Sequence, residues 1–169
     1  MLAHYELKFS GIASDVFARL RERVDTAVGK SVPDSIRKFT AAYDNLSSEN
    51  PEDWSNAVHS CRRILVDLAD KLYPPRGDKT VNAGGKTKVI QLGSENYVNR
   101  LIAFVEERSS SDRFKEIVGS HIAYLGQRVD AVVEATNKGS HENIVSREEA
   151  DRYVVYAYLL VGDILTLVA

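Results

Sequence analysis

Apolar residues recur at intervals of three and four along most of the chain, and this spacing predicts a succession of amphipathic helices. The first helix is expected to open at Ser14-Asp15 and to stop at Gly29. Its apolar face carries Phe17, Leu20, Val24 and Val28. Residues 2–11 are mixed in character, and we interpret them as an extended arm or an early helical turn.

The next two predicted helices are marked by proline as well as by apolar spacing. Pro33 suits the first position of a second helix, whose inward residues are Ile36, Phe39, Tyr43 and Leu46. Asn50-Pro51-Glu52-Asp53 is a strong start for a third, because a capping residue and a proline precede two acids at the positive end of the helix dipole. This helix is expected to run to about Leu72, before Pro74-Pro75.

The third predicted helix has one apolar and one polar face. The apolar face carries Trp54, Val58, Cys61, Leu65, Leu68 and Leu72, and the polar face carries Asn56, His59, Arg63, Asp67 and Asp70. Spacings of three and four bring these polar groups within reach of one another, so pairing along the helix surface is the simpler interpretation. The alternative is a polar face that lines a cleft.

Residues 73–93 are predicted to form one long connection without a convincing strand pair, and loops of this length are usually functional or mobile. The connection carries Arg76, Lys79, Lys86 and Lys88 around Gly84-Gly85. Gly85-Lys86-Thr87 does not complete a phosphate-binding loop, because Thr80 stands where that motif needs its first glycine. The loop is therefore either a solvated basic segment or a surface that steers RNA phosphates through Lys86 and Lys88.

Three further helices are predicted after this connection. Ser94 is expected to cap the fourth, which buries Tyr97, Leu101 and Phe104 and breaks at Ser109–Ser111. The fifth runs from about Asp112 to Thr136, with His121 and Arg128 close to its apolar stripe. One interpretation is that His121 is a core histidine with its hydrogen bonds satisfied and that Arg128 buries its stem while its charged head reaches solvent. The alternative is that Arg128 reaches toward the following break and supports an anion there.

The sixth predicted helix begins at the capping box Ser146-Arg147-Glu148-Glu149 and is apolar almost all the way round. Such a helix is buried on all sides, as a central helix or as part of a dimer interface. The whole pattern predicts one domain over residues 1–169, an all-α, up-down bundle of five to six helices.

Composition narrows the classes of function. The net charge is −2, so no global positive field indicates a nucleic-acid partner, and any such contact must be local. The single cysteine, Cys61, excludes a disulfide framework and fits a reduced, cytoplasmic setting. No signal peptide or membrane span is expected. The four histidines are too scattered for a zinc site, so we expect no metal and no cofactor.

The polar break between the last two helices, Thr136-Asn137-Lys138-Gly139-Ser140-His141, concentrates the versatile side chains. Adjacent Ser140 and His141 do not make a nucleophile–base pair, so a serine hydrolase is excluded. Without further context His141 is an exposed loop histidine.

The ending of this chain resembles that of HEPN-superfamily helical bundles in two successive stretches, Asn137-Lys138-Gly139-Ser140-His141 and Val145-Ser146-Arg147-Glu148-Glu149-Ala150. The signature of that superfamily is an arginine, usually followed by Asn, Asp or His, and then a histidine four to six residues after the arginine. Asn137 and His141 match the signature, and Thr136 occupies the arginine position. The resemblance covers about the last third of the chain.

The resemblance implies metal-independent RNA cleavage in a site shared across a homodimer, in a bacterial defence or toxin setting. His141 would be the general acid or base and Asn137 would orient it or the phosphate, while Lys138, Ser140, Arg128 and Arg147 would contact RNA. Either Lys138 or Arg128 in the same chain, or Arg147 or an arginine of the partner chain, would replace the charge missing at Thr136.

The alternative is a non-catalytic helical module that dimerises, binds nucleotide or RNA, or regulates an effector or antitoxin partner. The missing arginine, the slightly acidic charge and the apolar last helix favour it. An ending at Leu167-Val168-Ala169, without a polar tail, is also what a domain cut from a longer protein would show.

Overall fold

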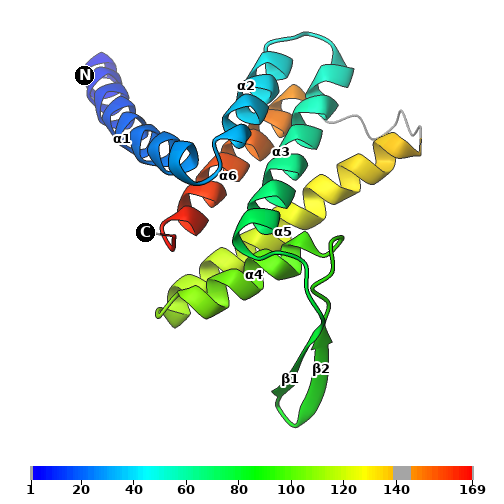
Figure 1. Ribbon diagram of the computed structural model, residues 1–169. Helices are drawn as coiled ribbons and strands as arrows, with labels where there is room; N and C mark the ends of the chain where they lie inside the picture. Colours follow the sequence, from blue (N-terminus) through cyan, green and yellow to red (C-terminus); the bar gives the residue numbers. More distant parts are fainter. Residues whose placement is uncertain (1, 139–145, 169) are drawn as a thin grey trace.

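The computed structural model describes the backbone of residues 2–138 and 146–168 and the side chains of residues 14–138 and 146–168. The described chain is a bundle of helices with one small two-stranded sheet (Figure 1), so the predicted all-α class is confirmed. The helices are α1 Leu2–Ser31, α2 Asp34–Leu46, α3 Pro51–Leu72, α4 Tyr97–Arg108, α5 Asp112–Asn137 and α6 Arg147–Leu165, and the strands are β1 Lys79–Ala83 and β2 Lys86–Ile90.

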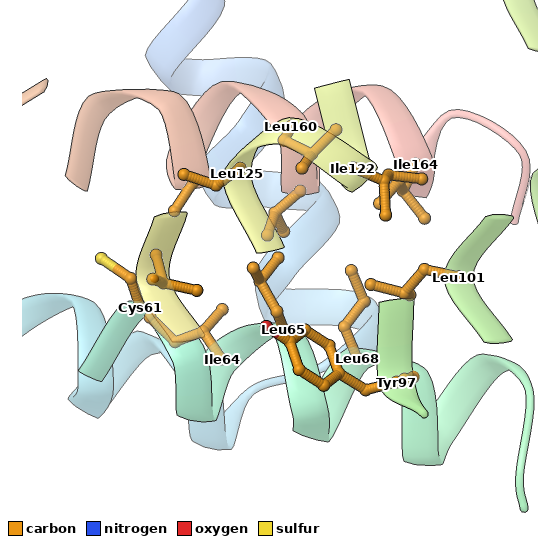
Figure 2. Close-up of a cluster of buried hydrophobic side chains, with 14 of the residues drawn as sticks. Cys61, Ile64, Leu65, Leu68, Tyr97, Leu101, Ile122, Leu125, Leu160 and Ile164 are labelled. Atoms are coloured by element: carbon orange, nitrogen blue, oxygen red, sulfur yellow. The ribbon is translucent and has the colours of Figure 1, made fainter. Parts of the chain in front are cut away.

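Helix α3 lies at the centre of the bundle, where it packs against α2, α4, α5 and α6. Leu65 and Leu68 of α3 and Leu160 of α6 fill the space between these two helices (Figure 2), and each is at most 3% exposed. Helix α6 also packs on α1, α2 and α5. It is not buried on all sides, however, because Val155 and Tyr156 are 48% and 46% exposed on its outer face.

Three helix starts are fixed by the side chains that their sequences supply. Asn50 accepts a hydrogen bond from the Glu52 amide at 3.1 Å, and Pro51 is the first residue of α3. Ser146 accepts from the Glu149 amide at 3.1 Å, so the predicted start of α6 is confirmed. Ser111 caps α5 in the same way.

Helix α1 begins at Leu2, so the prediction that it opens at Ser14-Asp15 is wrong. Serine and aspartate favour a helix start but do not prevent a helix from passing through them. Residues 2–13 continue the same helix rather than forming an extended arm. Figure 1 shows the N-terminal half of α1 projecting away from the bundle.

A β-hairpin occupies the connection that the sequence analysis expected to lack strands. Strands β1 and β2 pair antiparallel, from Lys79 opposite Ile90 to Ala83 opposite Lys86. Gly84 and Gly85 have φ angles of 59° and 76°, the left-handed values that a tight two-residue hairpin turn requires and that glycine adopts without strain. The hairpin therefore follows from its turn residues, although its strands are short and polar.

Buried Arg100 of α4 holds the base of this hairpin. Its guanidinium donates to Asp70 at 2.8 Å, to the Tyr73 carbonyl at 3.1 Å and to the Ser94 carbonyl at 3.0 Å. Ser94 does not cap α4 as predicted, since the helix begins at Tyr97 after Asn96. Arg100 thus ties the end of α3 to the segment that enters α4.

Candidate functional site at the α5–α6 junction

The residues predicted to act on RNA flank the chain that joins α5 to α6. Asn137 is the last residue of α5 and Lys138 follows it as the C-cap, while Arg147 is the first residue of α6. All three side chains are exposed. Ser140 and His141, the predicted substrate-binding and catalytic residues between these helix ends, lie outside the described residues.

Arg128 lies on α5 at the contact with α6, where its side chain is 53% exposed. Its Nη2 atom lies 3.9 Å from Glu149 Oε1, and the Tyr153 hydroxyl donates to the same carboxylate. Burial, followed by the hydrogen bond to Glu149, raises the pKa of Tyr153 to about 12, so it stays a donor near neutrality. Arg128 is thereby held over the first turn of α6.

Arg128 and Asn137 are separated along α5. The rise of an α-helix places residues that are nine apart about 13 Å from one another. Arg128 lies beside the first turn of α6, which begins at Arg147, whereas Asn137 is the last residue of α5. The structure therefore brings Arg128 to the start of α6 but does not bring it to Asn137.

Thr136, at the arginine position of the resemblance, is engaged with its own helix. Its hydroxyl donates to the Val132 carbonyl at 2.9 Å. The neighbouring Lys138 Nζ lies 2.5 Å from Glu134 Oε1, and this contact lowers the pKa of Glu134. Because both residues are exposed, the ion pair is weak and leaves Lys138 available to a stronger anion.

Lys86 and Lys88 stand on β2, with exposed side chains. Figure 1 shows the hairpin at the end of the bundle remote from the last turn of α5. The structure therefore separates these two lysines from Asn137, Lys138 and Arg147, and a ligand that touches both groups must extend along the bundle.

Two acids of the polar face of α3 pair with other helices instead of along α3. Asp67 pairs with Lys38 of α2, and Asp70 pairs with Arg100 of α4. His59 has an Nε2 atom that is buried without a hydrogen-bond partner among the described residues. Burial, followed by the charges of Arg63 and Arg62, lowers the pKa of His59 and favours its neutral form.

Two apolar hollows flank the outer face of α6, and the sequence analysis predicted neither. The hollow between α5 and α6 has a volume of about 440 Å³ and includes His121, which is exposed rather than a core residue, together with Tyr124 and Asp163. Burial raises the pKa of Asp163, and His121 opposes that shift. The second, which we call the α1 groove, lies between α1, α2 and α6 and has a volume of about 720 Å³.

Within the described part of the chain, no three His, Cys, Asp or Glu side chains form a group able to hold a metal ion. Nor is any helix of this part long and apolar enough to cross a membrane. No protein-family model, curated protein or solved structure matches the chain. The resemblance to the HEPN superfamily therefore depends on the stretch around residues 136–150 alone.

Proposed function

We propose that this chain is a HEPN-like, RNA-directed domain that cleaves RNA without a metal ion, in the cytoplasm of a bacterium as part of a defence or toxin system. One observation supports this most directly. Exposed Asn137 and Lys138 at the end of α5, and exposed Arg147 at the start of α6, flank the segment that carries Ser140 and His141.

In the proposed reaction, a ribose 2′-hydroxyl attacks the adjacent phosphorus and the 5′-oxygen of the next nucleotide leaves. His141 moves a proton to or from one of these oxygens, work that an imidazole does well near neutrality. Asn137 orients the histidine or the phosphate. The products are a 2′,3′-cyclic phosphate and a free 5′-hydroxyl.

Arg147 is the cation that we assign to the charged transition state. Thr136 bonds back to its own helix, and the guanidinium of Arg128 is already paired with Glu149. Arg147 stands at the N-terminal end of α6, where the helix dipole also favours an anion. A guanidinium is effective there because it offers several donors to phosphate oxygens.

The test is to incubate RNA with the purified protein in EDTA and to look for 2′,3′-cyclic phosphate ends. His141→Ala is expected to slow cleavage about 10²–10⁴-fold, and Arg147→Ala about 10²–10³-fold. Matched controls are His121→Ala, which removes an exposed histidine of α5, and Arg152→Ala, which removes an exposed arginine of α6. Equal activity of wild type and His141→Ala contradicts the proposal.

A second proposed function is self-association or docking of an effector by a non-catalytic module. It is supported by exposed large apolar side chains on the outer face of the bundle, among them Phe17, Tyr124, Val155 and Tyr156. Apolar surface of this kind is typical of protein interaction sites. In this alternative the C-terminal helices contribute to a homodimer.

Light scattering tests this second function. A dimer through α6 is expected to weaken on Leu159→Glu, since Leu159 lines both hollows beside α6, and to tolerate Arg152→Ala. A wild-type mass of one chain, 18.8 kDa, refutes self-association. Tight binding of RNA that weakens steeply with salt favours the RNA-directed function instead.

A further inference from the structure

The β-hairpin projects from one end of the bundle (Figure 1), and its register places all its lysines on one face. Lys86 lies opposite Ala83, and Lys88 lies opposite Val81. Directly opposed side chains share a face of a two-stranded sheet, and successive residues of a strand alternate between faces. Lys79, two residues before Val81, therefore joins Lys86 and Lys88 on what we call the lysine face.

The opposite face of the two strands is formed by Thr80, Asn82, Thr87 and Val89, which are uncharged and exposed. Lysine on an exposed strand also discourages pairing with the strands of other molecules. That role requires no particular face, so it does not account for three lysines on one side. The one-sided arrangement indicates a ligand that carries repeated negative charges.

The cations of the lysine face are available to such a ligand. Lys79 Nζ lies 3.2 Å from Glu107 Oε1, but Lys86 and Lys88 are exposed and form no ion pair with another residue that the structure describes. Residues 73–93 carry four basic residues and one acid in a chain whose net charge is −2. The hairpin is therefore a local positive site on an otherwise acidic chain, and such a site attracts a polyanion.

The side chains of the hairpin favour nucleic-acid phosphates over an anionic membrane. Its tip, Asn82-Ala83-Gly84-Gly85, has no aromatic or large apolar side chain to insert between lipids. The lysine face also has no aromatic ring on which a base could stack. Contact through lysine alone is made with phosphate groups and does not depend on the base sequence.

The length of α5 separates the hairpin from the proposed cleavage site. Lys79 pairs with Glu107, one residue before the end of α4, and α5 begins soon afterwards at Asp112. Asn137 is at the other end of α5, whose 26 residues span about 39 Å. A dinucleotide cannot extend over such a distance. An RNA of about 30 nucleotides can, since even a helically stacked strand advances about 3.4 Å per nucleotide.

We propose that the lysine face binds phosphate groups of RNA and so selects RNA molecules long enough to extend from the α5–α6 junction to the hairpin. This inference rests on the first proposed function, action on RNA, and names its substrate class as long RNA held without sequence preference. Lys86 and Lys88 supply affinity at a distance from the bond that breaks.

Binding to the full chain is measured with a 2′-O-methyl RNA of about 30 nucleotides, which has no free 2′-hydroxyl and stays intact. The double variant Lys86→Gln, Lys88→Gln is expected to weaken this binding at least tenfold at about 0.1 M salt. The slope of log affinity against log salt should become shallower by about 1.4, because each phosphate contact on a single strand contributes about 0.7.

Cleavage in EDTA gives a second readout. For the double variant, the KM of an unmodified long RNA should rise at least tenfold, with most of the loss in KM rather than in kcat. The preference for the long RNA over a dinucleotide, taken as the ratio of their kcat/KM values, should fall by the same factor. A loss that appears only in kcat contradicts a binding role for Lys86 and Lys88.

A variant that exchanges the two faces keeps both composition and net charge. It combines Lys86→Thr, Thr87→Lys, Lys88→Val and Val89→Lys, which moves two lysines to the opposite face of β2. We expect it to bind the long RNA as weakly as the glutamine variant does. Binding equal to that of the wild type overturns the lysine face and leaves only the net charge of the hairpin.

Lys30→Gln with Arg37→Gln is the control for net charge, since it removes two exposed cations near the junction of α1 and α2. It should leave the salt slope close to that of the wild type, and a loss equal to that of the hairpin variant overturns the inference. Binding of phosphatidylserine vesicles in place of RNA overturns the choice of ligand. RNA binding through the hairpin without cleavage contradicts only the proposed nuclease, and a wild type that binds no RNA overturns both.

Discussion

The guanidinium of Arg100, which is fully buried, lies 2.8 Å from the carboxylate of Asp70, which is 53% exposed. The pair joins α4 to α3 across the base of the hairpin, and the Tyr73 and Ser94 carbonyls accept further hydrogen bonds from the guanidinium, whose Nε is buried without a partner among the described residues. A buried cation whose counterion is removed keeps its desolvation cost without the compensating attraction.

We expect Asp70→Asn to lower the free energy of unfolding by about 1–3 kcal/mol, because it leaves the buried charge with neutral acceptors. The effect stays below that of a wholly buried pair, since water reaches Asp70. Glu148→Gln, which removes the exposed partner of Arg152, is the control and should change stability by less than about 0.5 kcal/mol. Urea unfolding measures both variants. Equal effects would show that burial of Arg100 is not the determining factor.

Replacing Gly126 or Gly119 of α5 with alanine is expected to change the stability of the protein in opposite directions. A Cβ atom at Gly126 would lie 2.4 Å from Val98 Cγ2 of α4, whereas one at Gly119 would meet nothing within 4 Å. Gly126→Ala should therefore destabilise the protein by about 1–3 kcal/mol through overpacking. Gly119→Ala should stabilise it by about 0.5–1 kcal/mol through helix propensity.

Thermal unfolding of the two alanine variants checks this contrast. Their melting temperatures should move in opposite directions from that of the wild type. A shift of the same sign in both would mean that α4 and α5 are not as close at Gly126 as the structure has them.

The thiol of Cys61 should be unreactive in the folded protein. Burial raises its pKa to about 12, from an ordinary value of 9.0, so little thiolate forms at about pH 8. We expect alkylation to follow the rate of unfolding and to become fast in urea. Mass spectrometry after timed exposure to iodoacetamide measures this rate. Rapid labelling without urea contradicts the burial of this side chain.

Stability should fall at alkaline pH. Burial, aided by the hydrogen bond to Asp25, raises the pKa of Tyr158, and burial beside Asp130 raises that of Tyr97. A group whose pKa is raised by folding stabilises the folded protein fully at pH values below its pKa in the unfolded chain, which is 10.0 for tyrosine and 9.0 for Cys61. That stabilisation is lost as the pH rises toward the pKa of the group in the folded protein.

Urea midpoints measured from about pH 8 to pH 11 test this expectation. The midpoint should decline above about pH 9, and Tyr97→Phe should make the decline shallower because phenylalanine has no proton to lose. Tyr124→Phe, at an exposed position, is the control and should leave the slope unchanged. A midpoint that does not change with pH contradicts the prediction.

Local signals in the sequence predicted much of the fold. The starts at Asn50-Pro51 and at Ser146 were readable because a cap and its amide partner are two or three residues apart. The hairpin was missed although Gly84-Gly85 marks a two-residue turn, because its flanking strands are polar and exposed and show no alternation. The start of α1 was missed because Ser14 favours a cap without enforcing one.

Contacts between distant segments could not be predicted in the same way. Arg100 is buried by partners at positions 70, 73 and 94, and nothing in its neighbouring sequence indicates this. Spacing placed Arg128 near the apolar stripe of α5, but only the packing of α6 decides that it lies exposed beside Glu149. The α1 groove likewise depends on how three helices meet.

The hairpin is closed at its base by contacts that do not involve its tip. The Arg76 amide donates to the Leu92 carbonyl at 3.1 Å, the Leu92 amide donates to Asp78 at 3.2 Å, and Arg100 fixes the segments on either side. The chain from β1 to β2 can therefore be shortened, lengthened or exchanged for a foreign peptide without reopening the bundle. Lys79 pairs with Glu107 and Ile90 packs against the core, so the part of the hairpin suited to an epitope or a fluorophore is its tip, residues 82–87.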